Sequence, residues 1–275
     1  MKRELFSLEN KVIVVTGGAG LLGLQHIEAI HRFGGQPVML DISHEAIEKG
    51  LEQLRKCGID NVWSHTLDVT DENQVREVSE LIQQELGNID GLVNNAAINP
   101  KVEKSNTKNF SRLEFFDLQQ WQLELSVGLT GAFLCTKYFG SAMAKAGNGG
   151  SIVNICSDLG VIAPDQRLYE QPELPEEQQP VKPVTYSVIK SGLIGLSKYV
   201  STYWPHKNIR CNALCPGGIE NDQPADFLEK ISSRIPMARM ARKDEYQGTL
   251  VWMLSDASSY LNGAVINVDG GRTAW

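Results

Sequence analysis

Short apolar runs alternate with longer segments of helical periodicity along almost the whole chain, which strongly limits the folds open to it. The runs are nearly continuous in apolar residues, as expected for parallel strands covered by helices on both faces. The predicted strands are Val12–Thr16, Pro37–Asp41, Val62–Leu67, Gly91–Asn94, Ile152–Ile155, Arg210–Leu214 and Ala264–Val268. The predicted helices are Leu21–Phe33, Ser43–Cys57, Glu72–Leu86, Leu113–Lys145, Thr185–Tyr203 and Asp244–Leu254. The pattern predicts an α/β fold with a doubly wound, Rossmann-like parallel sheet of about seven strands.

Length and charge narrow the possible functions further. A chain of 275 residues without an internal repeat or obvious linker is expected to form a single domain, residues 1–275. A net charge of −7 with no basic run argues against a nucleic-acid partner. No stretch approaches the roughly 20 apolar residues of a membrane span, and the start lacks the pattern of a signal peptide. The five scattered cysteines are expected to be buried thiols in a reducing cytoplasm, and no histidine or cysteine spacing predicts a metal site.

A glycine-rich loop joins the first predicted strand to the first predicted helix. It reads Thr16-Gly17-Gly18-Ala19-Gly20-Leu21-Leu22-Gly23 and fits either of two registers of the dinucleotide-binding fingerprint. Glycines let the backbone approach a pyrophosphate closely, and a helix N-terminus offers free N–H groups with a partial positive charge. We therefore expect a dinucleotide at this loop, although a plain tight turn would have a similar sequence. The cofactor contacts are assigned to Gly17, Gly20, Leu22 and Gly23.

Asp41 ends the second predicted strand, and its carboxylate is expected to set the choice of cofactor. A carboxylate at this point accepts hydrogen bonds from the adenosine ribose hydroxyls and repels a 2′-phosphate, which predicts NAD rather than NADP. The alternative is that Asp41 caps the following helix. Weaker candidates for the adenosine end are Asp68 and Val69 after the third strand and Asn94 and Ala96 after the fourth.

Tyr186 and Lys190 stand four residues apart and therefore share one face of a predicted helix. An unperturbed tyrosine has a pKa of about 10, too high for a base at neutral pH. A nearby lysine and a positively charged nicotinamide would lower that pKa. Such a pair often arises by chance, so the spacing alone does not identify a site.

Further motifs give the pair its context. One predicted strand ends in a serine, in the run Gly150-Ser151-Ile152-Val153-Asn154-Ile155-Cys156-Ser157. A second strand is followed by a proline and two glycines, in the run Asn212-Ala213-Leu214-Cys215-Pro216-Gly217-Gly218. A third motif, near the end of the sequence, is Asn267-Val268-Asp269-Gly270-Gly271. From Lys11 to Gly271 the chain resembles the short-chain dehydrogenase/reductase family. The resemblance implies an NAD(H)-dependent enzyme that interconverts a secondary alcohol and a carbonyl. It implies Ser157, Tyr186 and Lys190 as catalytic residues, Tyr186 and Lys190 also contacting the cofactor, with Pro216, Gly217 and Ile219 beside the nicotinamide.

Within that family the chain looks most like the flagellin modification protein A type, which is associated with unusual sugar biosynthesis. The features behind this closer resemblance are the glycine loop, the Ala163-Pro164-Asp165-Gln166 run and the Thr273-Ala274-Trp275 end. The resemblance suggests a sugar or sugar phosphate as the small-molecule substrate. It also implies a homodimer or homotetramer, for which Leu193, Ile194 and Leu196 are candidate contact residues.

Three features depart from the family pattern, and the first is Leu21, which stands in the glycine loop where the short branch of the family usually has a glycine. Gly128 occupies the position of an asparagine that normally takes part in a water-linked proton relay from the lysine. Its loss leaves open a second function, a non-catalytic NAD(H)-binding sensor or structural subunit. Residues 161–183 form a proline-rich insertion that is expected to lie near the substrate site. It is interpreted either as a lid whose Asp165, Gln166 and Glu170 contact a polar substrate, or as a solvated loop at an oligomer contact.

Overall fold

The computed structural model describes residues 5–98 and 109–275, and its framework is one parallel sheet. The sheet has seven strands in the order β3-β2-β1-β4-β5-β6-β7. They are β1 (Val12–Thr16), β2 (Gln36–Asp41), β3 (Trp63–Thr66), β4 (Gly91–Asn94), β5 (Gly150–Ile155), β6 (Ile209–Pro216) and β7 (Val265–Val268). Every neighbouring pair is parallel. The predicted doubly wound α/β fold is thus confirmed, with strand ends within two residues of those expected.

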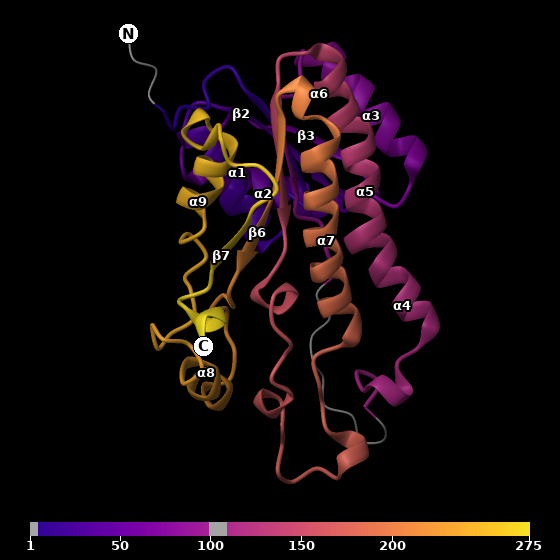
Figure 1. Ribbon diagram of the computed structural model, residues 1–275, viewed down its shortest axis with the longest axis vertical. Coiled ribbons are helices and arrows are strands. Elements are labelled where there is room, and N and C mark those ends of the chain that lie inside the picture. Colours follow the sequence, from indigo (N-terminus) through magenta and orange to yellow (C-terminus); the bar gives the residue numbers. More distant parts are fainter. Residues whose placement is uncertain (1–4, 99–108) are drawn as a thin grey trace.

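Helices cover both faces of the sheet, because residues along each strand alternate between two apolar cores (Figure 1). One core includes Val12 and Val14 and packs against α3 (Glu72–Glu85), α5 (Gly131–Cys135), α6 (Ser141–Ala146) and α7 (Val184–Tyr203). The other includes Ile13 and Val15 and packs against α1 (Leu21–Arg32), α2 (His44–Lys56) and α9 (Gln247–Leu254). Strand order reverses between β1 and β4, and in such sheets ligands bind at the carboxyl ends near that point.

The predicted helix Leu113–Lys145 is interrupted in the structure. A 3₁₀ turn, η1 (Leu113–Phe115), comes first, and Asp117 then caps α4 (Leu118–Leu125) by accepting from the Gln119 and Gln120 amides. Two π-helical turns, η2 (Ser126–Thr130) and η3 (Thr136–Gly140), separate α4, α5 and α6. Turns of this kind widen a helix locally and are frequent at functional sites. Gly128 lies in the first of them.

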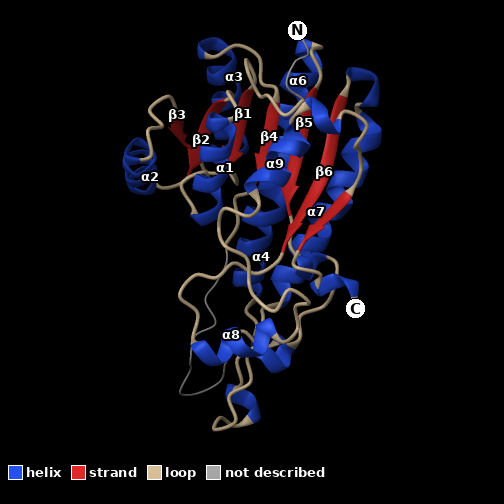
Figure 2. Cartoon of the chain, turned by 90° about the vertical axis from the view of Figure 1, so that its left-hand side faces the viewer, coloured by secondary structure: helices blue, strands red, loops and turns tan. Residues whose placement is uncertain are grey.

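Short elements gather below the carboxyl ends of the strands (Figure 2). Three 3₁₀ turns, η4 (Asp158–Gly160), η5 (Gln166–Leu168) and η6 (Glu176–Gln178), give form to the proline-rich segment, and α8 (Ala225–Ser232) lies beside it. The helix α8 is absent from the sequence prediction. Leu168 joins Ile231, Ile235 and Met240 in a small separate core. The remaining 3₁₀ turns are η7 (Pro205–Lys207), η8 (Asp256–Ser258) and η9 (Arg272–Ala274).

Two sequence expectations concern side-chain burial and membrane spans. Cys135, Cys156, Cys211 and Cys215 are buried free thiols as predicted, whereas Cys57 is exposed at the end of α2, so that expectation is wrong for this residue. Across residues 5–98 and 109–275, no helix combines the length and apolar character that a membrane crossing requires.

Candidate active site

The glycine loop between β1 and α1 requires glycine at two positions for different reasons. Gly17 has a φ of +60°, in the left-handed region, and an added Cβ would lie 2.9 Å from the Ala96 Cα. At Gly23 an added Cβ would lie 2.2 Å from the carbonyl oxygen of Gly17, which no side chain tolerates. The loop therefore folds back closely on the first turn of α1.

The start of α1 presents donors that suit a pyrophosphate. Leu24 is the first residue whose amide bonds within the helix, donating to the Gly20 carbonyl at 3.0 Å. The preceding helical amides, those of Leu21, Leu22 and Gly23, are the N-terminal donors that a helix leaves without an intrahelical acceptor. Gly20 caps the helix in an extended conformation with no side-chain cap. Bare amides, a helix dipole and close glycine packing fit the diphosphate of a nicotinamide dinucleotide.

Thr16 and Asn95, which the sequence analysis did not single out, hold this loop in place. The Thr16 hydroxyl accepts hydrogen bonds from the amides of Asn95 and Ala96, each at 3.1 Å. The Asn95 side-chain amide donates to the carbonyls of Thr16 and Gly17, each at 3.0 Å. These bonds join the end of β1 to the end of β4. The sequence shows a polar residue, Thr16, at the end of one strand and Asn94-Asn95 at the end of another. That these two strand ends lie side by side becomes clear only from the order of the strands in the sheet.

Asp41 points its carboxylate at the glycine loop. Its Oδ2 accepts from the Ala19 amide and its Oδ1 from the Ser43 amide, both at 3.2 Å. The cap of α2 is Ser43, whose hydroxyl accepts from the Ala46 amide at 3.1 Å. The capping alternative for Asp41 is therefore wrong, because Ser43 fills that role and leaves a carboxylate beside the loop.

The weaker adenosine-end candidates lie nearby but have structural partners. The Asp68 carboxylate accepts from the amide and hydroxyl of Thr70 at 2.8 and 2.7 Å. Val69 is buried against Gly131. The Asn94 side chain donates to Thr136 and Asn154 inside the molecule, so a ribose contact from this residue would have to come from its backbone. Ala96 lies against Gly17, at the loop itself.

Pro216, Gly217 and Ile219 continue from the end of β6. The Gly217 amide donates to the Val268 carbonyl at 2.9 Å, and an added Cβ at Gly217 would lie 2.9 Å from the Asp269 Cα. The Ile219 carbonyl accepts from the Gln223 side chain at 2.8 Å. This segment leaves the sheet at the same edge as the glycine loop, where the resemblance placed the nicotinamide.

Tyr186 and Lys190 share one face of α7, as predicted. The Lys190 ammonium is buried, donates to the Ile155 carbonyl at 2.8 Å, and lies 5.7 Å from the centroid of the Tyr186 ring. The carbonyl belongs to the last residue of β5, two residues before Ser157. The end of the strand therefore fixes the lysine, and the helix places the tyrosine one turn earlier.

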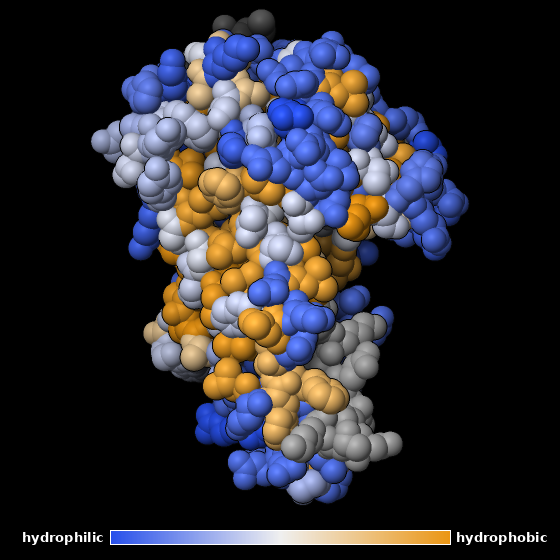
Figure 3. Space-filling model, turned by 90° about the vertical axis from the view of Figure 1, so that its right-hand side faces the viewer, coloured by the Kyte–Doolittle hydropathy of each residue, from blue (hydrophilic) through white to orange (hydrophobic). Residues whose placement is uncertain are grey.

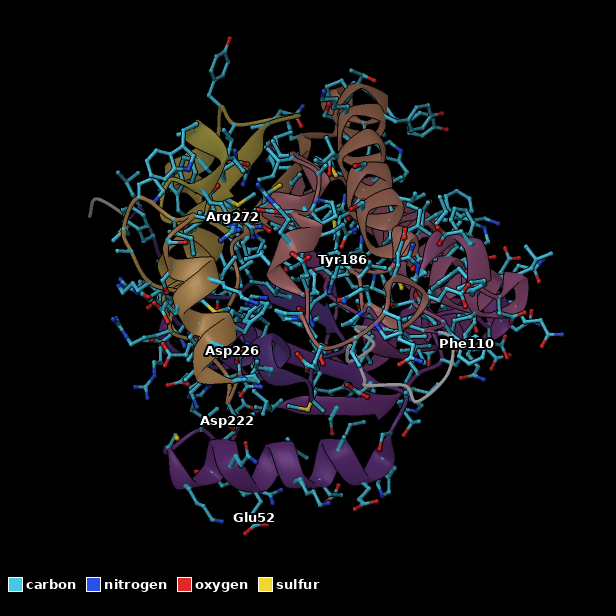
Figure 4. The ribbon with its side chains drawn as sticks, turned by 90° about the horizontal axis from the view of Figure 1, so that it is seen from below. Glu52, Phe110, Tyr186, Asp222, Asp226 and Arg272 are labelled. Atoms are coloured by element: carbon cyan, nitrogen blue, oxygen red, sulfur yellow. The ribbon has the colours of Figure 1, made fainter. Side chains whose placement is uncertain are left out.

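Ser157 completes the cluster, together with a charged pair that the sequence analysis missed. Its hydroxyl donates to the Asp158 carboxylate at 2.7 Å and accepts from the Leu159 amide at 3.2 Å. The other Asp158 oxygen accepts from the Arg272 guanidinium at 2.7 Å, and the exposed fractions of these two side chains are 3% and 9%. Figure 4 shows Tyr186 near the centre of the lower end, with Arg272 to one side of it and Phe110 to the other.

Burial dominates the protonation equilibria of these groups. It raises the pKa of Tyr186, an effect that a hydrogen bond with Ser157 opposes and the charge of Asp158 reinforces. Burial also lowers the pKa of Lys190. The sequence-based expectation of a lowered tyrosine pKa rested on the lysine and the nicotinamide together. The chain's own residues shift the pKa in the opposite direction, because desolvation of the phenolate, reinforced by the charge of Asp158, outweighs the hydrogen bond with Ser157.

The structure leaves no room for an asparagine side chain at Gly128. A Cβ there would lie 2.8 Å from the Ile189 Cγ2, since α7 packs closely on this π turn. One turn earlier, the buried Glu124 carboxylate accepts a short hydrogen bond from the Thr185 hydroxyl and another from Gln120 at 2.7 Å. Thr185 precedes Tyr186 directly, so a buried acid supports the first turn of α7.

The lid residues predicted for the proline-rich segment have partners within the protein. Asp165 pairs with Arg167 and Arg234, and these guanidiniums hold the pKa of its carboxyl well below the usual range. The Gln166 side chain is bonded to the backbone of residue 182, and the Glu170 carbonyl accepts from Lys230 at 3.1 Å. These bonds tie the segment to α8 and to itself. The geometry therefore favours a structural role for Asp165 over direct contact with a substrate.

Among residues 5–98 and 109–275, no group of three or more histidine, cysteine or acidic side chains is arranged so that it could hold a metal ion.

Comparison with known proteins agrees with this geometry. The profile of the short chain dehydrogenase family matches residues 11–169, and the enoyl-(acyl carrier protein) reductase profile matches residues 176–273. The 3-oxoacyl-(acyl-carrier-protein) reductase FabG of Thermotoga maritima is 32% identical, covering 96% of this chain and 98% of that protein. D-threitol dehydrogenase of Mycolicibacterium smegmatis is 31% identical, covering 98% of this chain and 95% of that protein. The crystal structure of a gluconate 5-dehydrogenase from Burkholderia cenocepacia J2315, in complex with NADP and tartrate, is similar with a TM-score of 0.81 and 26% identity, covering 99% of this chain and 98% of that one.

Proposed function

The chain belongs to the short-chain dehydrogenase/reductase family, and from this premise we propose that it is an NAD(H)-dependent oxidoreductase interconverting a secondary alcohol and a carbonyl. The observation that carries the proposal is the convergence of three side chains at the end of β5. Lys190 is anchored on the Ile155 carbonyl, Tyr186 lies one helical turn away, and Ser157 stands after β5, close enough to Tyr186 to affect its pKa.

The catalytic roles follow from what each group can donate or accept. In oxidation the Tyr186 oxygen takes the proton of the substrate hydroxyl, and in reduction it returns a proton to the carbonyl oxygen. The Ser157 hydroxyl donates to the same substrate oxygen, which is within its capacity because it is a rotatable donor. The Lys190 ammonium stabilises the phenolate and would hold the nicotinamide ribose. The cofactor, when bound, supplies or accepts the hydride.

The carboxylate of Asp41 supports NAD rather than NADP. It stands beside the glycine loop through its bond with the Ala19 amide, where a 2′-phosphate would meet a like charge. Titration calorimetry should find tighter binding of NADH than NADPH, and Asp41→Asn should narrow the difference. Equal binding of the two cofactors by the unaltered protein would contradict the preference for NAD.

A polyol, sugar or sugar phosphate is the proposed substrate class. Two of the similar proteins are named for D-threitol and gluconate, and the polar side chains of Ser157 and Lys190 lie beside Tyr186. Membership of the flagellin modification type points the same way and stays a prediction. A screen of polyols, sugar acids and sugar phosphates that follows NADH absorbance would test the class, with turnover of apolar alcohols alone counting against it.

The second candidate is a non-catalytic NAD(H)-binding protein, which the absence of space for a side chain at Gly128 favours. Tyr186→Phe separates the two functions, because it removes the acid and base but no predicted contact of the adenosine half. For an enzyme, the variant should lose at least about 100-fold in turnover, the scale of a lost general acid or base, with NADH affinity retained. Unchanged turnover would refute the mechanism, and no turnover of any screened alcohol by the unaltered protein would favour the sensor.

The chain is further proposed to act as one cytoplasmic domain, residues 1–275, that assembles into a homodimer or homotetramer. Its segment 161–183 is proposed to border the substrate site, since residue 182 is bonded through Gln166 and precedes α7. Apolar side chains gather along the face formed by α4, α5 and α7 (Figure 3). Leu123, Phe133 and Tyr199 are half or more exposed there. The contact residues expected from the sequence are less suitable, because Leu193 is buried and Ile194 and Leu196 pack against the core of the same chain. The exposed residues of α4, α5 and α7 are therefore the better candidates for a subunit contact.

A further inference from the structure

A second lysine lies closer to Tyr186 than the one that the sequence analysis identified. The Lys182 ammonium lies 3.8 Å from the centroid of the Tyr186 ring, against 5.7 Å for Lys190. A cation at this distance from an aromatic face is attracted to it, and more strongly where water is excluded. The proline-rich segment thus brings a charge directly onto the side chain that is proposed to exchange the proton.

The backbone that carries Lys182 is held on both sides. Its amide donates to the Gln166 Oε1 at 2.8 Å, and its carbonyl accepts from the Gln166 Nε2 at 3.4 Å. The neighbouring Val181 amide donates to the Ser111 hydroxyl at 3.0 Å. Pro183 then leads into α7, which bears Tyr186 in its first turn. The backbone from which the Lys182 side chain extends is therefore held close to the first turn of α7.

Among the described residues, charged groups on three elements act on Lys182. Burial and the charge of Lys190 on α7 lower its pKa to about 8, while Asp158 on η4 and Glu124 on α4 favour its charged form. Lys182 is therefore charged below about pH 8, and it can act on the phenolate in the NAD⁺ complex, where the positive nicotinamide also lowers the pKa of Tyr186. Ser157, Asp158 and Cys156 are the groups that affect the pKa of Tyr186 itself. On the proline-rich segment, burial raises the pKa of Tyr169, Arg272 lowers it and Tyr186 raises it.

These contacts reveal a need that Lys190 alone does not meet. The residues around Tyr186 raise its pKa, so a base at this position requires additional stabilisation of the phenolate. A cation on the ring face interacts more favourably with the negatively charged phenolate than with the neutral phenol. We propose that Lys182 is a positioning residue that stabilises the phenolate of Tyr186 and thereby extends proton abstraction toward neutral pH. The proposal rests on the proposed role of Tyr186 as the acid/base.

The decisive measurement is the ionisation of Tyr186 itself rather than turnover. Tyrosine labelled with a carbon isotope at Cζ reports phenolate formation by NMR, and Tyr186→Phe identifies the resonance. The protein is titrated as its complex with NAD⁺. Lys182→Met and Lys182→Gln should each raise the apparent pKa of Tyr186 by about one unit or more, the scale of a lost neighbouring charge. Lys182→Arg, which keeps the charge, should stay near the unaltered protein.

A matched control and a second readout make the result unambiguous. Lys198→Met makes the same substitution at an exposed position on α7 and should leave the apparent pKa unchanged. The acidic limb of the pH profile of kcat/KM, measured on the best substrate of the polyol screen, should move upward with the NMR value in both neutral variants. The proposal would be overturned if the apparent pKa of Tyr186 were unchanged in both variants while their circular dichroism spectra matched that of the unaltered protein. Retained turnover in Tyr186→Phe would instead overturn the proposed function, because the NMR result does not depend on catalysis.

Discussion

Replacing His26 with leucine is expected to remove a large part of the acid sensitivity of the fold. His26 lies on α1, the helix whose first turn would receive the cofactor, and its side chain is 1% exposed. Neither ring nitrogen has a hydrogen-bond partner among the residues that the structure describes. Burial therefore disfavours the imidazolium and lowers the pKa of His26 from its ordinary 6.5 to about 4.

The sign and size of the effect follow from proton linkage. Between pH 6.5 and about 4 the unfolded chain binds a proton at His26 that the folded protein does not bind, so unfolding becomes more favourable as pH falls. The stability is fully present above 6.5 and is lost progressively down to about 4. At about 1.36 kcal/mol for each pKa unit, the loss approaches about 3 kcal/mol, a large share of a typical free energy of unfolding.

Urea unfolding at a fixed protein concentration, repeated from neutral pH to about pH 4, tests this expectation. The difference between the unaltered protein and His26→Leu should grow by up to about 3 kcal/mol toward acid, because the contributions of the carboxyl groups cancel in the comparison. His31→Gln, on the same helix and partly exposed, is the control and should follow the unaltered protein. Parallel curves for the unaltered protein and His26→Leu would refute the reasoning.

Three further substitutions test the close contacts of the site. Gly23→Ala should weaken NADH binding by at least about 10-fold in calorimetry, since its Cβ would lie 2.2 Å from the Gly17 carbonyl oxygen and the overlap costs on the order of 1–3 kcal/mol; unchanged affinity would show that the loop relaxes. Arg272→Met should lower the free energy of unfolding by about 3–5 kcal/mol, because it leaves Asp158 buried without its cation, and adding Asp158→Asn should recover part of the loss. A loss below about 1 kcal/mol would place the pair in the weak class typical of exposed pairs. Gly128→Asn should destabilise the fold by about 1–3 kcal/mol in urea unfolding through overpacking against α7 rather than restore a relay, and a stable variant with faster turnover would contradict this.

The sheet and the helices nearest to it were predictable because their signals are local. Strands covered on both faces need continuous apolar runs, and the glycine loop must stand between the first strand and first helix. Tyr186 and Lys190 share a helix, so their spacing alone placed them together. Asp41 was assigned correctly to the end of β2, but its freedom from the capping role depended on Ser43, a choice between two neighbours that only coordinates resolve.

The rest of the site depends on contacts between distant parts of the chain. Arg272 reaches Asp158 across more than a hundred positions, and no periodicity relates the two. Lys182 lies in a segment whose many prolines predicted an irregular backbone, but they did not predict which part of the fold its side chains would contact. Glu124 was hidden because a carboxylate on an apolar helix face is ordinarily read as exposed. The interruption of the Leu113–Lys145 helix also escaped prediction, since π turns leave no mark in the apolar pattern.

The segment after β5 receives its shape from three parts of the chain at once. The last turn of the chain supplies Arg272 to Asp158, and the residues after α8 supply Arg234 to Asp165. Because Asp158 also accepts the Ser157 hydroxyl, the direction in which this serine donates depends on an ion pair made by the C-terminus. Any movement of the C-terminal segment would therefore change the donor available to a substrate oxygen as well as the packing. Distal substitutions there should alter kcat more than cofactor affinity, since the glycine loop is held separately by Thr16.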